Sequence, residues 1–272
     1  MSASRMKNLI LLILTLCALG LLCIVVPNRL AQTHEQRQML QELKTLYESY
    51  GLSVLLDELP RSPVLYSVEL SEDGAQTAAQ ALLGAKAAPA GESGFESTYE
   101  SELGTLHITR TGGFSAVMTG GSRVRSSEKA AEKLLRAMDF QYQTLTREQT
   151  AGTVQISASQ TLLGVPVLGS QLTLTYTDEQ LTAVDGTFYT GGSSITRVSE
   201  QEAISAADAL AQLLARRDAL GWVGSAVTGL TQAYLPSDQA GTGIRFVPVW
   251  LVETDAGSFF INGITREITA ET

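Results

Sequence analysis

The chain has 272 residues, of which 44% are hydrophobic and 17% charged, and its formal net charge is −9 at pH 7. Arg5 and Lys7 precede an uncharged apolar run at residues 8–26; without these two, 17 basic residues face 28 acidic ones, a net charge of −11. This acidity argues against nucleic acid and anionic lipid headgroups as partners. Both cysteines lie in the apolar run, so the remainder, roughly 240 residues, has no disulfide and is stabilised by its core alone.

The apolar run at residues 8–26 predicts one membrane-spanning helix. Its nineteen residues extend over roughly 28 Å as a helix, close to the hydrocarbon thickness of a bilayer. Arg5 and Lys7 crowd the short segment before the run, which favours a cytoplasmic N-terminus. A cleaved signal peptide is the alternative, because it also begins basic and continues apolar, but no small-x-small cleavage site follows the run. We therefore expect a single-pass protein of the cell membrane, with a cytoplasmic tip at 1–7, a retained transmembrane helix at 8–28 and an extracellular remainder.

Three small or weakly polar residues lie among the bulky aliphatic side chains of this run: Thr15, Ala18 and Gly20. Helices associate in lipid through close packing and interhelical hydrogen bonds, because burying leucine against leucine gains nothing over contact with acyl chains. We therefore predict that these three residues bind a partner helix. The alternative for Thr15 is a hydrogen bond to its own backbone.

Residues 29–50 predict a juxtamembrane helix, since they contain no proline or glycine and a glycine follows them. Apolar residues recur at helical spacing along it, namely Leu40, Leu43, Leu46, Tyr47 and Tyr50. Two interpretations are open. The stripe packs on the helix's own domain, or the helix extends the membrane span into a partner's helix.

We expect the remaining chain to adopt an α+β fold in two units, at 51–146 and 147–272. The first is expected to contain a strand at 64–70, a helix at 75–83, a flexible connector at 84–94, hairpin strands at 105–110 and 114–119, and a helix at 126–140. The second is expected to contain strands at 153–162, 165–176 and 181–189, a helix at 199–217 and a strand at 246–252. Ser199 and Glu202 have the spacing of a capping box at the start of the second unit's helix.

An internal repeat relates two segments of the second unit. Residues 177–186 and 254–263 both read Thr-Asp, five residues, a β-branched residue, Asp or Asn, and Gly. Each copy follows a Val-Pro-Val sequence and, further upstream, a helix that opens with Ser-Glu. The repeat predicts two copies of one helix followed by an antiparallel sheet, and a parallel sheet is not expected.

The second Val-Pro-Val lies in a strand that is apolar on both faces and contains Pro248 and Trp250. A proline cannot donate into a β ladder, so it marks a strand start, an edge or a bulge. One interpretation is that this strand is covered within the protein. The other is that Pro248 and Trp250 belong to an edge or apolar face that binds a partner.

Motifs for catalysis or metal binding are missing from the sequence. His34 and His107 are far apart, and no cysteine or spaced carboxylate group accompanies them to form a metal site. The sequence contains no nucleophile elbow, zinc-protease helix, phosphate-binding loop or dinucleotide-binding glycine motif. Asp178, Asp185 and Asp255 are expected at hairpin turns, where aspartate is favoured. We therefore expect a protein that is not an enzyme and has no cofactor, metal or catalytic residue.

The chain resembles the YycH/YycI proteins of Gram-positive bacteria in four features: the N-terminal span, the acidic exported part, the GVPV sequence at 164–167 that leads to LTLTYTDEQLTAVDG, and the VPVW strand at 247–250. The resemblance covers the span and residues 126–272. It implies a membrane-anchored accessory regulator of a cell-wall-related two-component system, without catalytic residues. The implied partners are a sensor histidine kinase, a homologous regulator protein or both, contacted by the span and the exported domain. The helix-plus-sheet repeat also resembles PepSY-type domains.

Three functions follow as hypotheses. The first is a signalling modulator of this kind. The second is a PepSY-like inhibitor or chaperone of a secreted protease, which would insert a strand edge or a tail into a cleft. The third is a module that binds cell-wall fragments, which would need a polar pocket.

Overall fold

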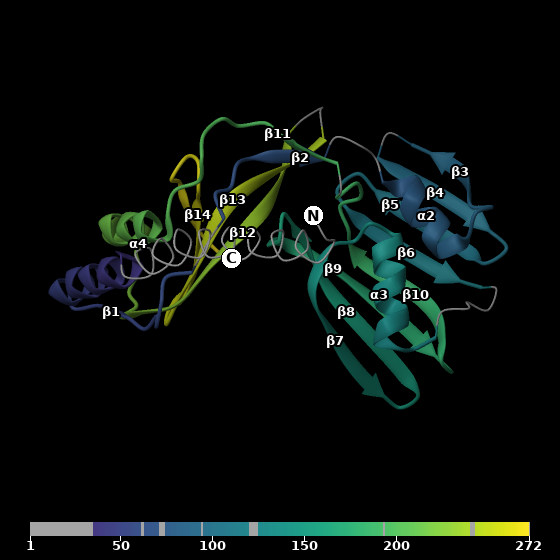
Figure 1. The fold of residues 1–272 in the computed structure, drawn as a ribbon, viewed down its shortest axis with the longest axis horizontal. Helices are drawn as coiled ribbons and strands as arrows, with labels where there is room; N and C mark the ends of the chain where they lie inside the picture. The colour runs from purple at the N-terminus through teal and green to yellow at the C-terminus, as the bar shows by residue number, and fades with distance from the viewer. Residues whose placement is uncertain are drawn as a thin grey trace, which may run out of the picture. The chain divides into compact units, whose positions relative to one another are not determined.

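A computed structural model describes residues 35–271 except for short gaps at 61–62, 71–73, 94, 120–124, 193 and 240–242. It has a mixed α+β fold dominated by β-structure (Figure 1). The expected span at residues 8–26 lies outside the described residues. Among the helices that are described, none is both long enough and apolar enough to cross a bilayer.

The described chain forms two compact units, each built from several stretches of sequence. Unit 1 contains the residues up to 60 together with Ala206–Leu230 and Val252–Gly257, and unit 2 contains the other described residues. The units therefore do not follow the expected boundary between residues 146 and 147. Strands β12 (Ala226–Gln239) and β13 (Gly243–Thr254) each have residues in both units.

Unit 1 includes the predicted juxtamembrane helix, which is described over residues 35–49. Its other elements are β1 (Ser53–Val54), α4 (Ala206–Ala215), α5 (Arg217–Leu220), the start of β12 and the end of β13. Leu40, Leu43 and Tyr47 are buried, and the Tyr47 hydroxyl donates to the Leu210 carbonyl of α4 at 2.8 Å. The helix therefore packs one stripe on its own unit, as the first interpretation holds. Of the expected stripe, Leu46 and Tyr50 are exposed.

The helix expected at 199–217 begins later than the capping box predicts. Ser199 accepts a hydrogen bond from Gln201 N at 3.1 Å, and α4 starts at Ala206. Arg197 donates to the Ser199 and Glu200 carbonyls at 2.6 and 2.7 Å. Because those carbonyls already have partners in an irregular backbone, the local sequence signal does not nucleate the helix.

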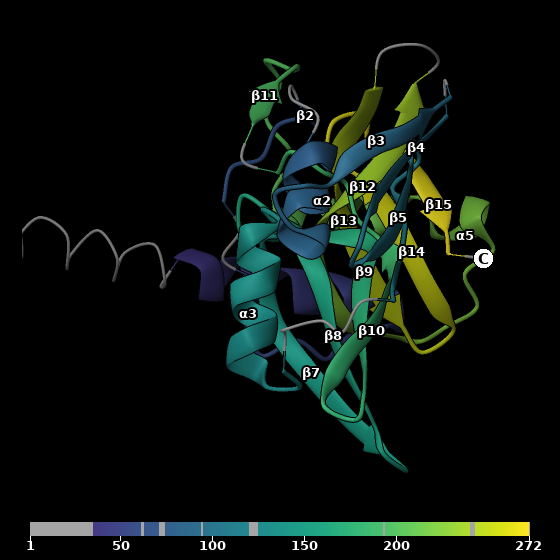
Figure 2. The same ribbon diagram turned by 90° about the vertical axis from the view of Figure 1, so that its right-hand side faces the viewer.

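Unit 2 is built around an antiparallel sheet. Its strands are β3 (Ala88–Glu92), β4 (Glu96–Ser101), β5 (Gly104–Thr109), β6 (Gly113–Met118), β7 (Tyr142–Thr150), β8 (Thr153–Leu162), β9 (Val165–Thr177) and β10 (Gln180–Thr187). Their spatial order is β3-β4-β5-β6-β10-β9-β8-β7. Helices α2 (Ala75–Leu83) and α3 (Glu128–Ala137) lie on one face of this sheet (Figures 1 and 2).

The sequence of each helix explains its packing. In α2 three of the five buried residues are alanines, whose small side chains allow close approach to the sheet. In α3 the Ser127 side chain accepts from Ala130 N at 3.3 Å, which satisfies one free N–H of the first turn. Leu134 and Leu135 face the sheet and are 5% and 0% exposed, as their spacing predicts.

Two strands of this sheet lie outside the expected elements. The expected connector at 84–94 contains β3, and β7 lies between the predicted helix at 126–140 and the strand at 153–162. They form the two edges of the sheet, and none of the residues of β7 is buried. An edge strand of this kind lacks the alternation of apolar residues that identifies a half-buried strand.

The antiparallel expectation holds throughout this sheet and fails at two short contacts elsewhere. Strand β1 pairs in parallel with the start of β12, at Ser53 and Ala226. Tyr234 of β12 pairs in parallel with Val167 of β9.

Unit 2 also contains β2 (Val68–Leu70), β11 (Ile195–Arg197), most of β14 (Gly257–Asn262) and β15 (Ile268–Ala270).

The internal repeat corresponds to two hairpins of the same design. Strands β9–β10 and β13–β14 are each joined by a two-residue turn, at residues 178–179 and 255–256. The glycine that ends each copy has a backbone carbonyl against it: a Cβ at Gly186 would overlap the Gln171 oxygen, and a Cβ at Gly263 would lie 2.8 Å from the Pro248 oxygen. The repeated glycine therefore has the same steric reason in both copies.

Asp255, in the turn of the second copy, binds three donors. Its carboxylate accepts from Ser225 Oγ at 2.7 Å and from the Ser225 and Ala226 amides. The hydrogen bond from the Ser225 hydroxyl and then the two backbone bonds lower the Asp255 pKa. The Asp255 carboxylate therefore stabilises the folded state at pH values above its unfolded pKa, near 3.8. This stabilisation is lost as the pH falls through the lower pKa of the folded state. We expect the difference in Tm between the wild type and Asp255→Asn to shrink as the pH is lowered from about 5 to about 3; a constant difference would contradict this.

Tyr176 presents a contrasting case in the core of unit 2. Its ring is fully buried and its hydroxyl has no hydrogen-bond partner among the described residues, and burial raises its pKa to about 12. Removing an unpaired buried hydroxyl relieves a desolvation penalty, so we expect Tyr176→Phe to leave the free energy of unfolding unchanged or to raise it by about 0.5 to 1 kcal/mol. The control is Tyr234→Phe, which removes a hydroxyl that donates to Tyr66 O at 3.3 Å. A loss of stability in Tyr176→Phe, measured by chemical denaturation, would show that the hydroxyl has a partner.

Candidate interaction face

The face of the β3–β10 sheet that α2 and α3 do not cover is lined by polar side chains. Strand β9 shows the pattern most clearly. Leu172, Leu174 and Tyr176 are 0% exposed and belong to the core under the helices, whereas Thr173 and Thr175 alternate with them and are half-buried. Because successive strand residues point to opposite faces, the threonines lie on the open face.

The strand register joins such residues into continuous rows. One row crosses seven strands, from β4 to β7, and consists of Thr98, His107, Ser115, Asp185, Thr173, Ser157 and Thr146. The neighbouring row consists of Glu100, Thr105, Val117, Ala183, Thr175, Gln155 and Glu148. We call these two rows, together with Glu96, the open face. Most of its side chains carry a hydroxyl, an amide or a carboxylate.

Hydrogen bonds between neighbouring strands orient several of these side chains. Ser115 donates to Asp185 at 2.8 Å, and the hydroxyls of Ser157 and Thr173 are 3.0 Å apart. His107 Nδ1 lies 3.0 Å from a Glu96 carboxylate oxygen. Cross-strand pairs of this kind stabilise the sheet, and they also hold the hydroxyl groups in a fixed pattern.

The open face carries more negative than positive groups. Glu96, Glu100, Asp185 and Glu148 are carboxylates, and His107 is the one basic side chain in this set. The face therefore has the same sign of charge as the chain as a whole, whose formal net charge is −9. A partner with Lys, Arg or amide donors fits it better than an anionic one.

The face brings together serine, histidine and aspartate, which are the residue types of a catalytic triad. In a triad the imidazole lies between the serine and the carboxylate. Here Ser115 donates directly to Asp185, and His107 Nδ1 is engaged by Glu96 and Thr98. The geometry is therefore suited to binding through hydroxyl groups. Nor do His, Cys, Asp and Glu side chains gather anywhere in the described part of the chain into a group that could hold a metal ion.

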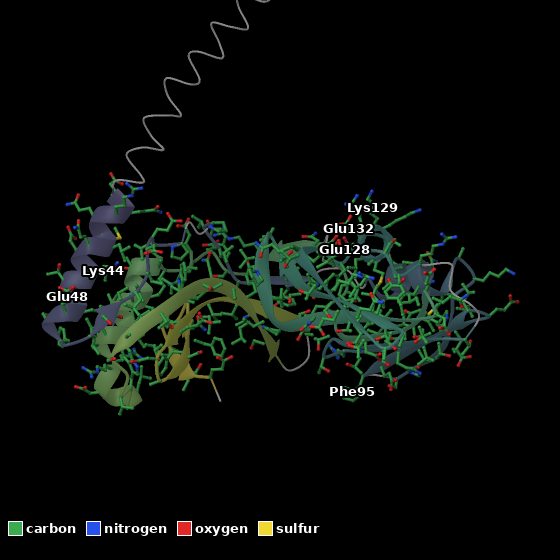
Figure 3. The ribbon with its side chains drawn as sticks, turned by 90° about the horizontal axis from the view of Figure 1, so that it is seen from below. Lys44, Glu48, Phe95, Glu128, Lys129 and Glu132 are labelled. Atoms are coloured by element: carbon green, nitrogen blue, oxygen red, sulfur yellow. The ribbon has the colours of Figure 1, made fainter. Side chains whose placement is uncertain are left out.

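An exposed aromatic ring lies beside this face. Phe95, in the connection between β3 and β4, is 80% exposed. Figure 3 shows it on the opposite side of unit 2 from Glu128, Lys129 and Glu132 of α3. The ring therefore projects from the side of the sheet that the helices leave uncovered.

The residues predicted from sequence to bind a partner lie elsewhere. Thr15, Ala18 and Gly20 are outside the described residues. Pro248 is buried, and Trp250 is 1% exposed with its indole N–H donating to the Ile204 carbonyl at 2.9 Å. These surroundings agree with the interpretation that the strand is covered within the protein. Partner binding by Pro248 and Trp250 stays a prediction, and it requires the strand to become uncovered.

A strand was expected at 165–176, but its threonines were not assigned to a site. The signal that was available is a polar residue at every second position of β9. The rows across the other strands depend on the register, because residues such as His107 and Ser115 become neighbours only when the strands pair.

No known family model matches the chain, and no curated protein matches it. Among solved structures, an uncharacterized protein from Eubacterium rectale ATCC 33656 is similar, with a TM-score of 0.49 and 11% identity over 81% of this chain and 90% of that one. The C-terminal domain of YpeB from Bacillus megaterium has a TM-score of 0.36 and 14% identity over 75% of this chain and 99% of that one. At these scores neither likeness supports an inference about function, and the fold rests on the elements described above.

Proposed function

We propose that the chain is a membrane-anchored accessory regulator of a cell-wall-related sensor histidine kinase, of the YycH/YycI kind, and that it works through protein contacts without catalysis. The open face is its docking surface. The observation that carries the proposal is the row of oriented polar side chains that crosses seven strands, from Thr98 to Thr146. Such a surface offers many hydrogen-bonding groups to an extended partner surface.

The shape of the surface favours a protein over a small ligand. Small-molecule sites are concave and mostly apolar, with volumes of roughly 300 to 1,000 Å³. A hollow of about 380 Å³ at the end of the β7–β8 hairpin reaches a comparable size, but exposed polar residues such as Glu148, Thr150 and Gln155 line it. Glu148 and Gln155 belong to the open face, and a sheet face with fixed hydroxyls is better matched to a protein surface than to a wall fragment held in a pocket.

The edges of the sheet weigh against the protease-inhibitor hypothesis. Strand β3 contains Pro89 and a register shift between Pro89 and Gly91, and both limit the addition of another strand. Strand β7 carries Arg147 and Glu148 at the other edge. Charged edge strands also resist strand addition, so the open face is a better docking surface than either edge.

The test is copurification of a sensor histidine kinase with the full-length chain from detergent-solubilised native membranes. Thr173→Arg/Thr175→Arg places two bulky cations on the open face, and we expect it to reduce the recovered kinase by about tenfold or more, since a clash at the centre of an interface removes at least 1.4 kcal/mol. The control, Gln80→Arg/Ala137→Arg, adds the same two charges to exposed positions of α2 and α3 and should leave recovery unchanged. Equal recovery with both variants would contradict the proposed docking surface, and recovery of no kinase by the wild type would contradict the proposed function.

A further inference from the structure

A second apolar stripe runs along helix 35–49 beside the one that it buries. Met39, Leu46 and Tyr50 are 45%, 43% and 60% exposed. Their spacings of seven and four residues place them within about 40° of one another around the helix axis. They therefore form one continuous strip on the solvent side of Leu43 and Tyr47, which we call the outer stripe.

The outer stripe has an acidic border. Glu35 and Glu42 are exposed, lie seven residues apart and are displaced from the stripe by about 40° to 60° on the side away from the buried residues. Lys44 and Glu48, labelled in Figure 3, lie about 140° and 180° from the stripe, on the far side of the helix. One border of the outer stripe is thus unit 1 itself, and the other is a pair of carboxylates.

The charge changes at the C-terminal end of the stripe. Arg217 Nη1 lies 3.5 Å from the Tyr50 carbonyl oxygen. The carboxylates therefore border the N-terminal half of the helix, and a guanidinium lies beside its C-terminal end. A partner that complements this pattern has its cations opposite Glu35 and Glu42.

We propose that the outer stripe binds an amphipathic helix of a partner protein, whose apolar stripe is bordered by Lys or Arg at a seven-residue spacing. Anionic lipid is disfavoured because it would bring negative headgroups against Glu35 and Glu42. A second copy of the chain is disfavoured because its own outer stripe is bordered by carboxylates, and the cations of its helix, Arg37 and Lys44, lie on the far side. The inference rests on the proposed function in one respect: a partner anchored in the same membrane would present its own membrane-proximal helix beside this one.

The probe is a synthetic helix of about 21 residues, with a leucine stripe bordered by lysines and a fluorescein label. Its matched peptide has glutamate in place of every bordering lysine. Full-length protein is held in nanodiscs of zwitterionic lipid, empty nanodiscs serve as the blank, and binding is read as fluorescence anisotropy. We expect the lysine peptide to bind about tenfold or more tightly than the glutamate peptide.

Two variants locate the binding on the helix. Met39→Gln/Leu46→Gln removes the apolar contacts and should weaken binding of the lysine peptide by about tenfold. Arg37→Gln/Lys44→Gln introduces the same residue on the far side and should leave the apolar contacts intact, so binding should be retained. Melting curves of both variants check that the helix remains folded.

Equal binding of the two peptides, or equal binding by the two variants, would overturn the inference. Concentration-dependent self-association of the wild type that Met39→Gln/Leu46→Gln abolishes would identify a second copy as the occupant and overturn it as well. The binding measurement contains no kinase, so its outcome does not depend on whether the proposed function is correct. If open-face variants release the kinase while the lysine peptide shows no preference for the stripe, the proposed function stands and this inference falls.

Discussion

Replacing Tyr47 by alanine should lower the free energy of unfolding by about 3 to 5 kcal/mol, the usual cost of truncating a buried aromatic side chain. The ring is 0% exposed in unit 1, and burial raises the pKa of its hydroxyl well above the usual range. The hydroxyl donates to the Leu210 carbonyl of α4, so truncation also removes a buried hydrogen bond. For a chain of this size the expected fall in Tm is roughly 6 to 20 °C.

Hydrogen exchange identifies the part of the protein that Tyr47→Ala destabilises. In Tyr47→Ala, amides of helix 35–49 and of α4 should exchange faster, because both elements lose the contact that joins them. Tyr47→Phe keeps the ring and should cost only about 1 kcal/mol. Tyr50→Ala, at a 60% exposed position in the next turn, should stay within about 0.5 kcal/mol of the wild type. A Tyr47→Ala protein that melts like the wild type would mean that this helix is a free stalk rather than part of unit 1.

Gly186→Ala is expected to destabilise unit 2 by about 2 to 6 kcal/mol, for two reasons that add. Gly186 has a φ of +142°, a backbone conformation that L-residues rarely adopt and that costs them about 1 to 3 kcal/mol. A Cβ there would also overlap the Gln171 carbonyl oxygen, and that atom belongs to the paired backbone of β9. Relief requires β9 and β10 to separate locally, with a further cost of about 1 to 3 kcal/mol.

The matched control is Gly91→Ala in edge strand β3. No atom lies within 4 Å of a Cβ built at Gly91, so we expect stability to be unchanged or raised by up to about 1 kcal/mol. Chemical denaturation followed by circular dichroism compares the two variants. Equal stabilities would show that the hairpin tolerates a side chain at the repeated glycine, and the steric account of the repeat would then be wrong.

Local sequence signals predicted those elements whose own residues decide their structure. The helix at 75–83 matches α2 residue for residue, and α3, capped by Ser127, lies within the helix expected at 126–140. The alternation in LTLTY predicted β9, because one side of that strand faces the core. Asp178 and Asp255 lie in hairpin turns, at 178–179 and 255–256, as expected, whereas the same expectation is wrong for Asp185, which lies inside β10 and pairs with both neighbouring strands.

The elements that were missed depend on contacts with other segments rather than on the pattern of their own residues. Strand β3 reads APAGE, a composition typical of a connector, and it is a strand because β4 offers it an edge. The start of α4 was misplaced because Arg197 holds the carbonyls that follow Ser199 in an irregular backbone. A capping signal is local, whereas the Ala203 and Ile204 amides that follow it donate to the Leu65 and Gly263 carbonyls, which lie far away in the sequence.

The open face could be predicted only in part, for the same reason. Thr173 and Thr175 show from sequence alone that β9 has a polar side. The polar side continues through Asp185, Ser115 and His107 because the strands pair in the order β9-β10-β6-β5. In this order β10 lies between β9 and β6, which are far from each other in the sequence. Register is a tertiary property, and no single strand encodes it.

The central claim is that the open face carries regulation of a kinase, and its most direct test is the autophosphorylation rate of the copurifying histidine kinase in proteoliposomes. Three proteins are compared: the full-length wild type, Thr173→Arg/Thr175→Arg, and the control Gln80→Arg/Ala137→Arg. We expect the wild type and the control to change the rate by about fivefold or more, in the same direction, as a typical coupling energy allows. The open-face variant should leave the rate at that of the kinase alone. A rate that responds to the open-face variant as strongly as to the wild type would contradict the claim.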